Sequence, residues 1–341
     1  MRSRGTTTPA ADSEPGTALR VALRDALRDA LRTPTVGPLA ALAIAVLVFS
    51  VTTDTFLAPE NLSLVLQQSI VIGTLALGQS LIILTAGIDL SNGAIAVLGT
   101  LVMAKLVFEG NSPVAALLLG LVVTTFLGLV NGLLVARLGL PPFIVTLGAL
   151  TVVYAAGRLY SDSRSFPVTN DLLVFWGNGV HLGGVLFTWG TLLLVGLYAF
   201  FWYVLTKTAW GRHIYAVGDA PESARLTGIN VRRTVLSVYI TAGLLYGIAA
   251  WQALGRIPNA DPNSYQTANL ESITAVVIGG TSLFGGRGSV AGTLIGTLIV
   301  TVLRSGLTQA GIDSLYQDVA TGTLVIVAVG VDKVLRRGST R

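Results

Sequence analysis

The chain has 341 residues, of which 52% are hydrophobic and 11% charged, and its formal net charge is +5 at pH 7. Soluble domains carry about 25% charged residues, so this composition excludes an ordinary soluble protein and predicts one embedded in membrane lipid. Cysteine is absent and only two histidines are present, which excludes disulfides, thiolate metal sites and a histidine-rich metal centre. The basic residues gather at the ends of apolar runs, so the positive charge indicates membrane topology and not nucleic-acid binding.

The first 34 residues are hydrophilic and lack the apolar core and cleavage site of a secretory signal peptide. We expect residues 1–34 to form a retained cytoplasmic tail. Leucine and arginine recur in it every four residues, at Leu19, Leu23, Leu27 and Leu31 and at Arg20, Arg24, Arg28 and Arg32. The repeat fits an amphipathic helix on an anionic membrane surface, and it also fits a solvated basic arm that only sets orientation.

Apolar runs of membrane length follow one another from Thr35 onward. They predict an all-α, polytopic membrane protein of about ten transmembrane helices, with a transmembrane domain at 35–336 and a C-terminal tail at 337–341. The expected spans are residues 36–56, 69–86, 92–108, 113–136, 143–160, 185–205, 234–254, 271–284, 288–306 and 318–335.

The loops between these spans differ in charge. With the N-terminal tail inside, 17 of the 22 basic residues fall on the inner side, and the five on the outer side are Lys105, Arg158, Arg164, Arg256 and Arg304. The bias has the sign that the positive-inside rule requires, so both termini are predicted to be cytoplasmic.

The longest expected outer segment covers residues 161–184 and contains Phe175 and Trp176. Aromatic residues there fit either anchoring at the level of the lipid headgroups or contact with a partner protein. No outer segment is long enough to form a ligand-binding domain, so capture of an external substrate is expected to belong to another chain.

A charged segment at 207–233 separates two membrane spans and is expected to be cytoplasmic. Asp219 and Glu222 have the spacing of a capping box, Pro221 suits a first helical turn, and Gly228 suits a left-handed C-terminal position. The pattern predicts a docking helix of about two turns at 220–227, too short to be stable unless it packs on its own protein or on a partner. The candidate coupling residues are Asp219, Ala220, Pro221, Glu222, Ser223, Ala224, Arg225, Leu226, Thr227 and Gly228.

Glycine patterns predict two further features of the membrane domain. GxxxG spacings allow close helix packing, and they occur at Gly128 and Gly132, at Gly243 and Gly247, and at Gly292 and Gly296, although such matches also arise readily by chance in a chain with 39 glycines. Two interrupted hairpins, starting at Leu84 and Val277, share residues when aligned so that Gly87 matches Gly280 and Val97 matches Val290. The match suggests a duplication, although both hairpins are expected to have the same sense across the membrane, whereas transporter repeats are often inverted.

Polar residues inside or beside the spans are candidates for a translocation path or hinge. Asp89 is the ionisable residue nearest to apolar surroundings, and it fits either a helix N-cap with Ser91 and Asn92 or a direct role in transport. Gln79 and Asn131 fit either hydrogen bonds between helices or contacts with a ligand. The full candidate set is Gln79, Asp89, Ser91, Asn131, Thr281 and Ser282.

Motifs of catalysis are missing from the sequence. It contains no GxxxxGK[ST] phosphate loop, no HExxH, no GxSxG and no paired acidic cluster. The chain is therefore not expected to be an enzyme or to hold a cofactor. If transport uses ATP, a separate subunit must bind the ATP and Mg²⁺ and hydrolyse the nucleotide.

Four motifs resemble the permease subunits of bacterial ABC importers for monosaccharides, of the ribose, xylose and galactose type. They are AGIDLSNG, NGLLVARLGLPPFIVTLGAL, GRHIYAVGDAPESARLTGINVRR and GGTSLFGGRGSVAGTLIG, and the likeness runs from about Leu57 to the last span. The sequence has Ala86 where the family usually has the first glycine of GGIDLS, and Asn92 where a small apolar residue is common.

The resemblance implies a multi-pass protein of the bacterial cytoplasmic (inner) membrane. It also implies cytoplasmic ATP-binding subunits, a second permease chain that is identical or paralogous, and a periplasmic or lipid-anchored sugar-binding protein. In that family the segment matching 220–228 is the coupling region that docks on the ATPase. The alternatives are a secondary transporter driven by an ion gradient, a membrane anchor for a cytoplasmic enzyme, and an ABC permease for another small polar solute such as branched-chain amino acids.

Overall fold

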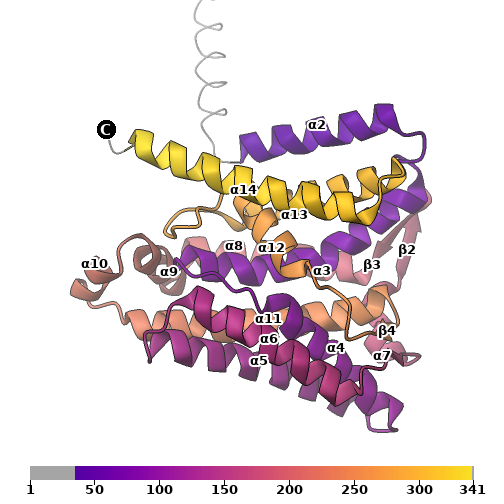
Figure 1. Ribbon diagram of the computed structural model, residues 1–341, viewed down its shortest axis with the longest axis horizontal. Coiled ribbons are helices and arrows are strands. Elements are labelled where there is room, and N and C mark those ends of the chain that lie inside the picture. Colours follow the sequence, from indigo (N-terminus) through magenta and orange to yellow (C-terminus); the bar gives the residue numbers. More distant parts are fainter. Residues whose placement is uncertain (1–34, 340–341) are drawn as a thin grey trace, which may run out of the picture.

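The computed structural model describes residues 35–339. The expectations for the Leu/Arg repeat of the N-terminal tail therefore lie outside the described residues. The described chain is a bundle of helices that run roughly parallel or antiparallel to one another, with short connections at its two ends (Figure 1). This arrangement confirms the all-α polytopic fold.

The helices have the following bounds: α2 Val36–Thr52, α3 Pro59–Leu84, α4 Asn92–Phe108, α5 Pro113–Ala136, α6 Pro142–Ser161, α7 Asp171–Val174, η1 Phe175–Gly177, α8 Trp189–Lys207, α9 Ala209–Asp219, α10 Pro221–Leu226, α11 Val231–Arg256, α12 Ala268–Ile278, α13 Val290–Gln309 and α14 Ser314–Ser339. Two short antiparallel pairs join β1 Phe166–Pro167 to β4 Asn259–Ala260 and β2 Gly179–Leu182 to β3 Val185–Thr188. Proline opens α3, α5, α6 and α10, where a missing amide hydrogen costs no helical bond.

Each expected span has a helix, but several bounds differ from the prediction. Six of the described helices are long and apolar enough to cross a membrane, namely α3, α5, α6, α8, α11 and α13. The prediction started α3 ten residues too late, because Glu60, Asn61, Gln67 and Gln68 made its first turns look like a loop. It was also wrong at 185–188, which forms β3, and at 279–284, which belongs to a turn after the 11-residue helix α12.

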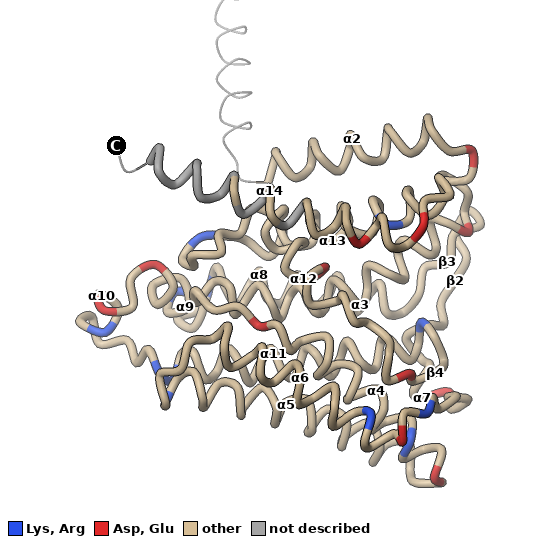
Figure 2. The backbone as a smooth tube through the Cα atoms, viewed as in Figure 1, with Lys and Arg blue, Asp and Glu red and all other residues tan. Residues whose placement is uncertain are grey.

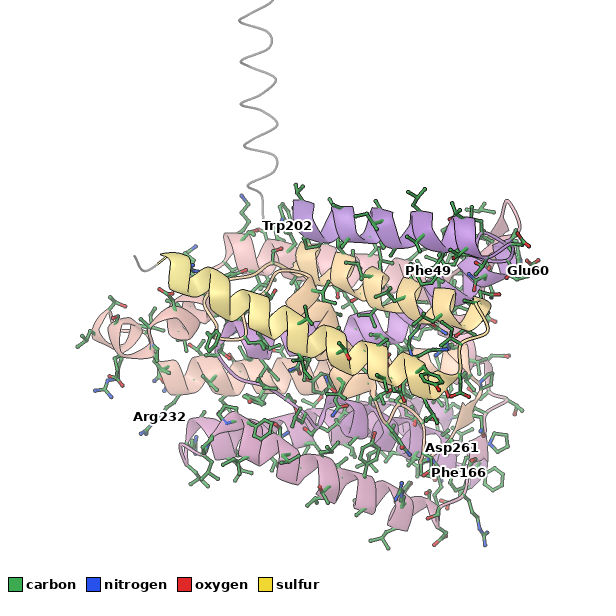
Figure 3. All side chains as sticks on the ribbon, turned by 45° about the horizontal axis from the view of Figure 1, so that its top comes forward. Phe49, Glu60, Phe166, Trp202, Arg232 and Asp261 are labelled. Carbon is green, nitrogen blue, oxygen red and sulfur yellow. The ribbon has the colours of Figure 1, made fainter. Side chains whose placement is uncertain are left out.

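The bundle has two distinct ends. The start of α2, the end of α14 and the pair α9–α10 lie at one end, while β2, β3, β4 and α7 lie at the other (Figure 1). Charged residues gather toward these ends and leave long uncharged stretches between them (Figure 2). Arg232 marks the α10 end, while Glu60, Phe166 and Asp261 lie at the opposite end (Figure 3).

The GxxxG pairs form close helix contacts, as the sequence predicted. Gly128 and Gly132 of α5 face α11, where a Cβ added to Gly243 would lie 3.0 Å from the Gly128 Cα. A Cβ on Gly292 of α13 would overlap the carbonyl oxygen of Gly279, just after α12. The main chains touch at these points, so glycine is needed there for packing.

The aromatic residues of the 161–184 segment pack on the protein itself. The Trp176 ring meets the Trp251 ring of α11 edge to face, with the ring centroids 5.0 Å apart. Phe175 in turn packs edge to face on Trp176 and remains 43% exposed. Trp176 thus fixes η1 onto α11, a role that neither sequence-based alternative included.

Candidate functional site

The membrane domain contains a stretch of non-helical backbone deep in its interior. Helix α3 ends at Leu84, the chain runs back as residues 85–91, and α4 begins at Asn92. Asp89, Ser91 and Asn92 are at most 1% exposed. Irregular backbone at membrane depth is tolerated only where protein groups or a wet cavity satisfy its amides and carbonyls.

Polar side chains from neighbouring helices supply these bonds. In the amide orientation that satisfies both of its atoms, Gln79 Nε2 donates to the Asp89 carbonyl at 2.9 Å and Oε1 accepts from the Asp89 amide at 3.2 Å. The Thr146 hydroxyl donates to the Ile88 carbonyl at 3.0 Å. Asn269 Nδ2 donates to the Leu90 carbonyl at 3.2 Å. Three helices therefore hold the broken segment by its main chain.

The Asp89 carboxylate is itself fully engaged. Its Oδ1 accepts from the Ser91 amide at 2.8 Å and from the Ser91 hydroxyl at 2.6 Å, and its Oδ2 accepts from the Tyr246 hydroxyl at 3.2 Å. Asn131 Nδ2 donates to the same Ser91 hydroxyl at 3.0 Å. Asp89 thus orders the turn before α4, although the N-cap residue is Ser91, whose side chain makes no capping bond.

Gln79→Leu should lower the stability of the solubilised protein. The substitution leaves the buried amide and carbonyl of Asp89 without partners, and each unsatisfied group costs about 1–3 kcal/mol. We expect the apparent Tm in detergent to fall by several degrees, measured by fluorescence-detected gel filtration after heating. Gln67→Leu on the same helix is the matched control, and equal Tm values for the two variants would contradict the assigned bonds.

Four of the six candidate path residues, Gln79, Asp89, Ser91 and Asn131, form this one cluster. Thr281 and Ser282 do not join it; they lie in the turn between α12 and α13, where the Ser282 amide donates to the Arg287 carbonyl at 2.9 Å. Tyr246, Thr146 and Asn269 belong to this cluster but were not among the residues predicted from the sequence. Each is a polar residue in or next to a helix with a buried face, and the sequence carried no sign that they converge.

The two hairpins turn at the same end of the bundle, as expected. Their turns touch, because the Gly286 amide donates to the Leu84 carbonyl at 3.0 Å. The proposed alignment of the hairpins is wrong, however. Val97 is the sixth residue of α4, whereas Val290 is the first residue of α13, so the matched residues do not hold equivalent positions.

The left-handed residue after α3 is Ala86, with φ of 61°, and the corresponding residue after α12 is Gly280, with φ of 86°. The two helices end in turns of the same type. The Gly87 amide donates to the Ile82 carbonyl after α3, and the Thr281 amide donates to the Val276 carbonyl after α12. A residue with a Cβ, such as Ala86, is conformationally disfavoured in this region of φ, so a glycine at position 86 would relieve strain.

The charged segment at 207–233 contains two helices, where the sequence predicted one. Helix α10 at Pro221–Leu226 matches the expected docking helix, but its N-cap is Ala220 and makes no side-chain bond. The predicted capping box is wrong because Asp219 ends the preceding helix α9. The predicted C-terminal glycine is correct: Gly228 has φ of 88°, and the Ile229 amide donates to the Ala224 carbonyl at 3.1 Å.

Helix α10 exposes most of its surface. The side chains of Glu222 and Arg225 are 82% and 73% exposed and lie 3.8 Å apart, and Leu226 is 86% exposed. Only Ala224 of this helix is buried. Helix α10 therefore presents an exposed leucine beside an exposed pair of opposite charges.

The end of α9 lies between the two hairpin turns. A Cβ on Gly218 would overlap the Leu84 carbonyl oxygen, and Gly286 closely approaches the Asp219 Cα. The Tyr215 hydroxyl donates to the Gly288 carbonyl at 2.9 Å. Helix α9 therefore connects the exposed helix α10 directly to the turns of α3–α4 and α12–α13.

The family model described as the branched-chain amino acid transport system permease component matches residues 61–329. The chain belongs to this family. It is therefore a membrane permease component of an import system, and this family membership implies that it is not itself the ATPase.

Several curated relatives align with this permease over nearly its whole length. It is 44% identical to the fructose import permease protein of Rhizobium meliloti, with 89% of this chain and 87% of the relative covered. It is 37% identical to the ribose import permease protein of Bacillus subtilis, covering 87% and 92%, and 34% identical to the galactose/methyl galactoside import permease protein of Escherichia coli, covering 85% and 90%. No solved structure matches the permease.

Proposed function

We propose that the permease forms the translocation path of an ATP-driven monosaccharide importer of the bacterial cytoplasmic membrane. The relatives named above import fructose, ribose and galactose, and they support a monosaccharide over an amino acid as the substrate. The partners are cytoplasmic subunits that bind ATP and Mg²⁺, a second permease chain and an extracytoplasmic sugar-binding protein. Helix α10 faces the cytoplasm and docks on an ATP-binding subunit.

The contact of α9 with both hairpin turns carries this proposal. When the ATP-binding subunits close, α10 moves with them, and α9 passes the displacement to the turns at 84–86 and 285–286. These turns end α3 and precede α13, two helices that pack against each other along the bundle. Their movement changes which end of the path is open.

The hydrogen bonds of Asp89 give no support to a secondary transporter. A secondary transporter needs an intramembrane carboxylate that is free to take up an ion or proton. Asp89 is buried in the described membrane domain, but its two oxygens are already bonded to Ser91 and Tyr246. A simple membrane anchor would not need α9 wedged between two internal turns.

The double variant Glu222→Ala with Arg225→Ala tests the docking role of α10. The pair is solvent-exposed, and such pairs contribute little to folding, so the permease should reach the membrane at normal levels. In proteoliposomes with the ATP-binding subunits and the binding protein, we expect sugar uptake to fall by about tenfold or more. ATP hydrolysis should no longer rise when sugar-loaded binding protein is added.

Arg232→Ala is the control for this test, because Arg232 is an exposed arginine at the same end of the bundle but outside α10. Wild-type uptake and wild-type ATPase stimulation in the double variant would rule out α10 as the coupling element. Sugar accumulation by the permease alone, driven by an ion gradient, would overturn the proposed function as a whole.

A further inference from the structure

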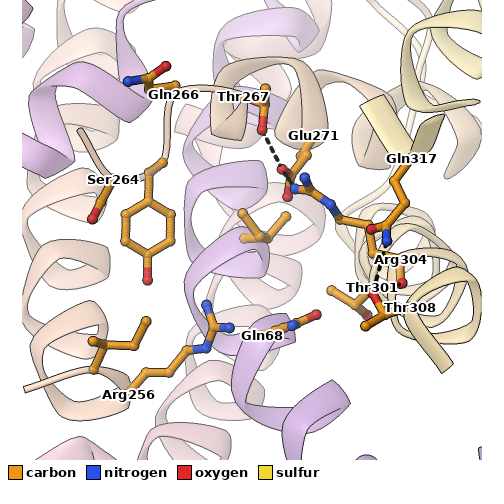
Figure 4. Close-up of a pocket in the computed structure, with 13 residues that line it drawn as sticks. Gln68, Arg256, Ser264, Gln266, Thr267, Glu271, Thr301, Arg304, Thr308 and Gln317 are labelled. Atoms are coloured by element: carbon orange, nitrogen blue, oxygen red, sulfur yellow. Dashed lines mark hydrogen bonds and ion pairs between the residues drawn. The ribbon is translucent and has the colours of Figure 1, made fainter. Parts of the chain in front are cut away.

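A polar pocket opens near the β4 end of the bundle, opposite α10. Its volume is about 350 Å³, which is within the range of about 300–1,000 Å³ typical of small-molecule sites. We call it the Arg256 pocket. Its walls come from α3, the end of α11, the loop after it, α12, α13 and α14, and the residues that matter below are Gln68, Arg256, Tyr265, Glu271 and Arg304 (Figure 4).

The pocket contains hydrogen-bonding groups that the protein leaves unused. Arg256 forms no ion pair with any residue that the structure describes, and its guanidinium reaches into the pocket toward Gln68 (Figure 4). The Gln68 amide makes no hydrogen bond within 35–339. The buried Tyr265 hydroxyl faces the Arg256 guanidinium and interacts with it electrostatically.

A fixed carboxylate lies on the far wall. Glu271 Oε1 accepts from the Thr267 hydroxyl at 2.9 Å and forms an ion pair with Arg304, which also pairs with Asp318 at 3.1 Å. Glu271 Oε2 accepts no hydrogen bond from the described part of the chain. The pocket thus presents donors on Arg256 and an acceptor on Glu271, whose carboxylate is fixed by Thr267 and Arg304.

This combination fits a solute with many hydroxyl groups. Each hydroxyl donates one hydrogen bond and accepts others, so one solute can accept from a guanidinium and donate to a carboxylate. Of the thirteen lining residues only Ile72 and Ile257 are aliphatic, which leaves little surface for a branched aliphatic side chain. The two cations Arg256 and Arg304 are balanced by the two carboxylates Glu271 and Asp318, so these four groups give the pocket no net charge.

We propose that the Arg256 pocket is a low-affinity subsite for a neutral polyhydroxylated solute, occupied after the solute leaves the binding protein. This inference rests on the proposed function, because it assigns the pocket to the imported sugar. Arg256 and Gln68 bind hydroxyl groups on one wall, and Glu271 accepts a hydroxyl hydrogen on the other. The pocket is open and its hydrogen bonds are few, so the sugar is held briefly and released into the path.

Two variants test the subsite in the assembled complex. Arg256→Gln removes the guanidinium, and Gln68→Leu removes the amide; Arg164→Gln and Gln67→Leu are the matched controls, because neither residue lines the pocket. With radiolabelled fructose, ribose and galactose as probes, we expect the maximal uptake rate to fall by about tenfold in the two variants and not in the controls. The KM for loaded binding protein should stay unchanged.

A direct binding measurement keeps the proposal falsifiable if a variant folds poorly. Saturation-transfer NMR on purified wild-type permease should show contact with the imported sugar, and this signal should be lost in Arg256→Gln and kept in Arg164→Gln. A signal from leucine in place of the sugar would overturn the assignment.

The kinetic outcomes separate the two proposals. A rise in KM for loaded binding protein with no change in maximal rate would make the pocket a docking surface and overturn the subsite. Variants that match their controls would also overturn it. A wild-type complex that imports none of the sugars with ATP and binding protein would instead overturn the proposed function.

Discussion

Gly243→Leu is expected to leave almost no folded permease in the membrane. Gly243 lies where α11 crosses α5, and a Cβ there would come within 2.7 Å of the Thr124 carbonyl oxygen and 3.0 Å of the Gly128 Cα. Overpacking costs about 1–3 kcal/mol where side chains can rearrange. The obstacles here are main-chain atoms of the facing helix, so the two helices must separate and the loss should be larger.

The measurement is the monodisperse peak in fluorescence-detected gel filtration of a detergent extract. Gly196→Leu on α8 is the matched control, because nothing lies within 4 Å of a Cβ at that position. Both variants put leucine in place of glycine inside a membrane helix, so helix propensity and hydrophobicity change alike. A Gly243→Leu peak as large as that of Gly196→Leu would show that the α5–α11 contact does not need glycine.

Gly218→Val is expected to lower sugar uptake strongly while leaving a folded permease. The new side chain would collide with the Leu84 carbonyl and with the main chain of Gly286, and would push the end of α9 away from both hairpin turns. Helix α9 lies at one end of the bundle, so the packing of the long helices should survive. In the reconstituted complex we expect uptake to fall by about tenfold or more and ATP hydrolysis to become independent of loaded binding protein.

Gly148→Val is the control for this variant, since it adds the same side chain at a helical glycine with open space around it. Gel filtration must show that both proteins remain monodisperse. Normal uptake by the Gly218→Val complex would mean that the contact of α9 with the turns does not transmit motion. Comparison of Gly218→Val with the α10 double variant would show whether coupling is lost at the surface of α10 or at the contact of α9 with the turns.

The approximate positions of the helices followed from apolar runs alone, because lipid requires about 20 apolar residues per crossing. Of the ten predicted spans, six correspond to described helices that are long and apolar enough to cross a membrane. The prediction lost accuracy where helices begin with polar residues, as α3 does at Glu60 and Asn61, or stop inside the bundle, as α12 does at Ile278. Those boundaries depend on buried partners. Asn61, for example, can be buried near the start of α3 because its Oδ1 accepts a hydrogen bond from the Ser305 hydroxyl at 2.7 Å.

The charged segment at 207–233 likewise combines features that local sequence predicts with features that depend on tertiary packing. Pro221 and Gly228 predicted a short helix with a left-handed end, and both signals are local, since each depends on the backbone of one turn. The predicted capping box was wrong because Asp219 is the last residue of α9, whose apolar face packs on α8 and α11. Helix α9 has 11 residues and lies inside a charged stretch, so the sequence alone did not predict it. Its apolar face is recognised as such only when α8 and α11 are seen to pack against it.

By itself, the sequence determined the membrane class, the all-α fold and the existence of the short helix α10 between two apolar spans. Each of these depends on composition or on residues a few positions apart. Only the tertiary structure decided that Gln79, Thr146 and Asn269 hold the broken segment before α4, that α9 links α10 to both turns, and that Arg256 and Glu271 share one pocket. These contacts join residues up to 179 positions apart in the chain, and no periodicity in a sequence encodes which distant helices meet.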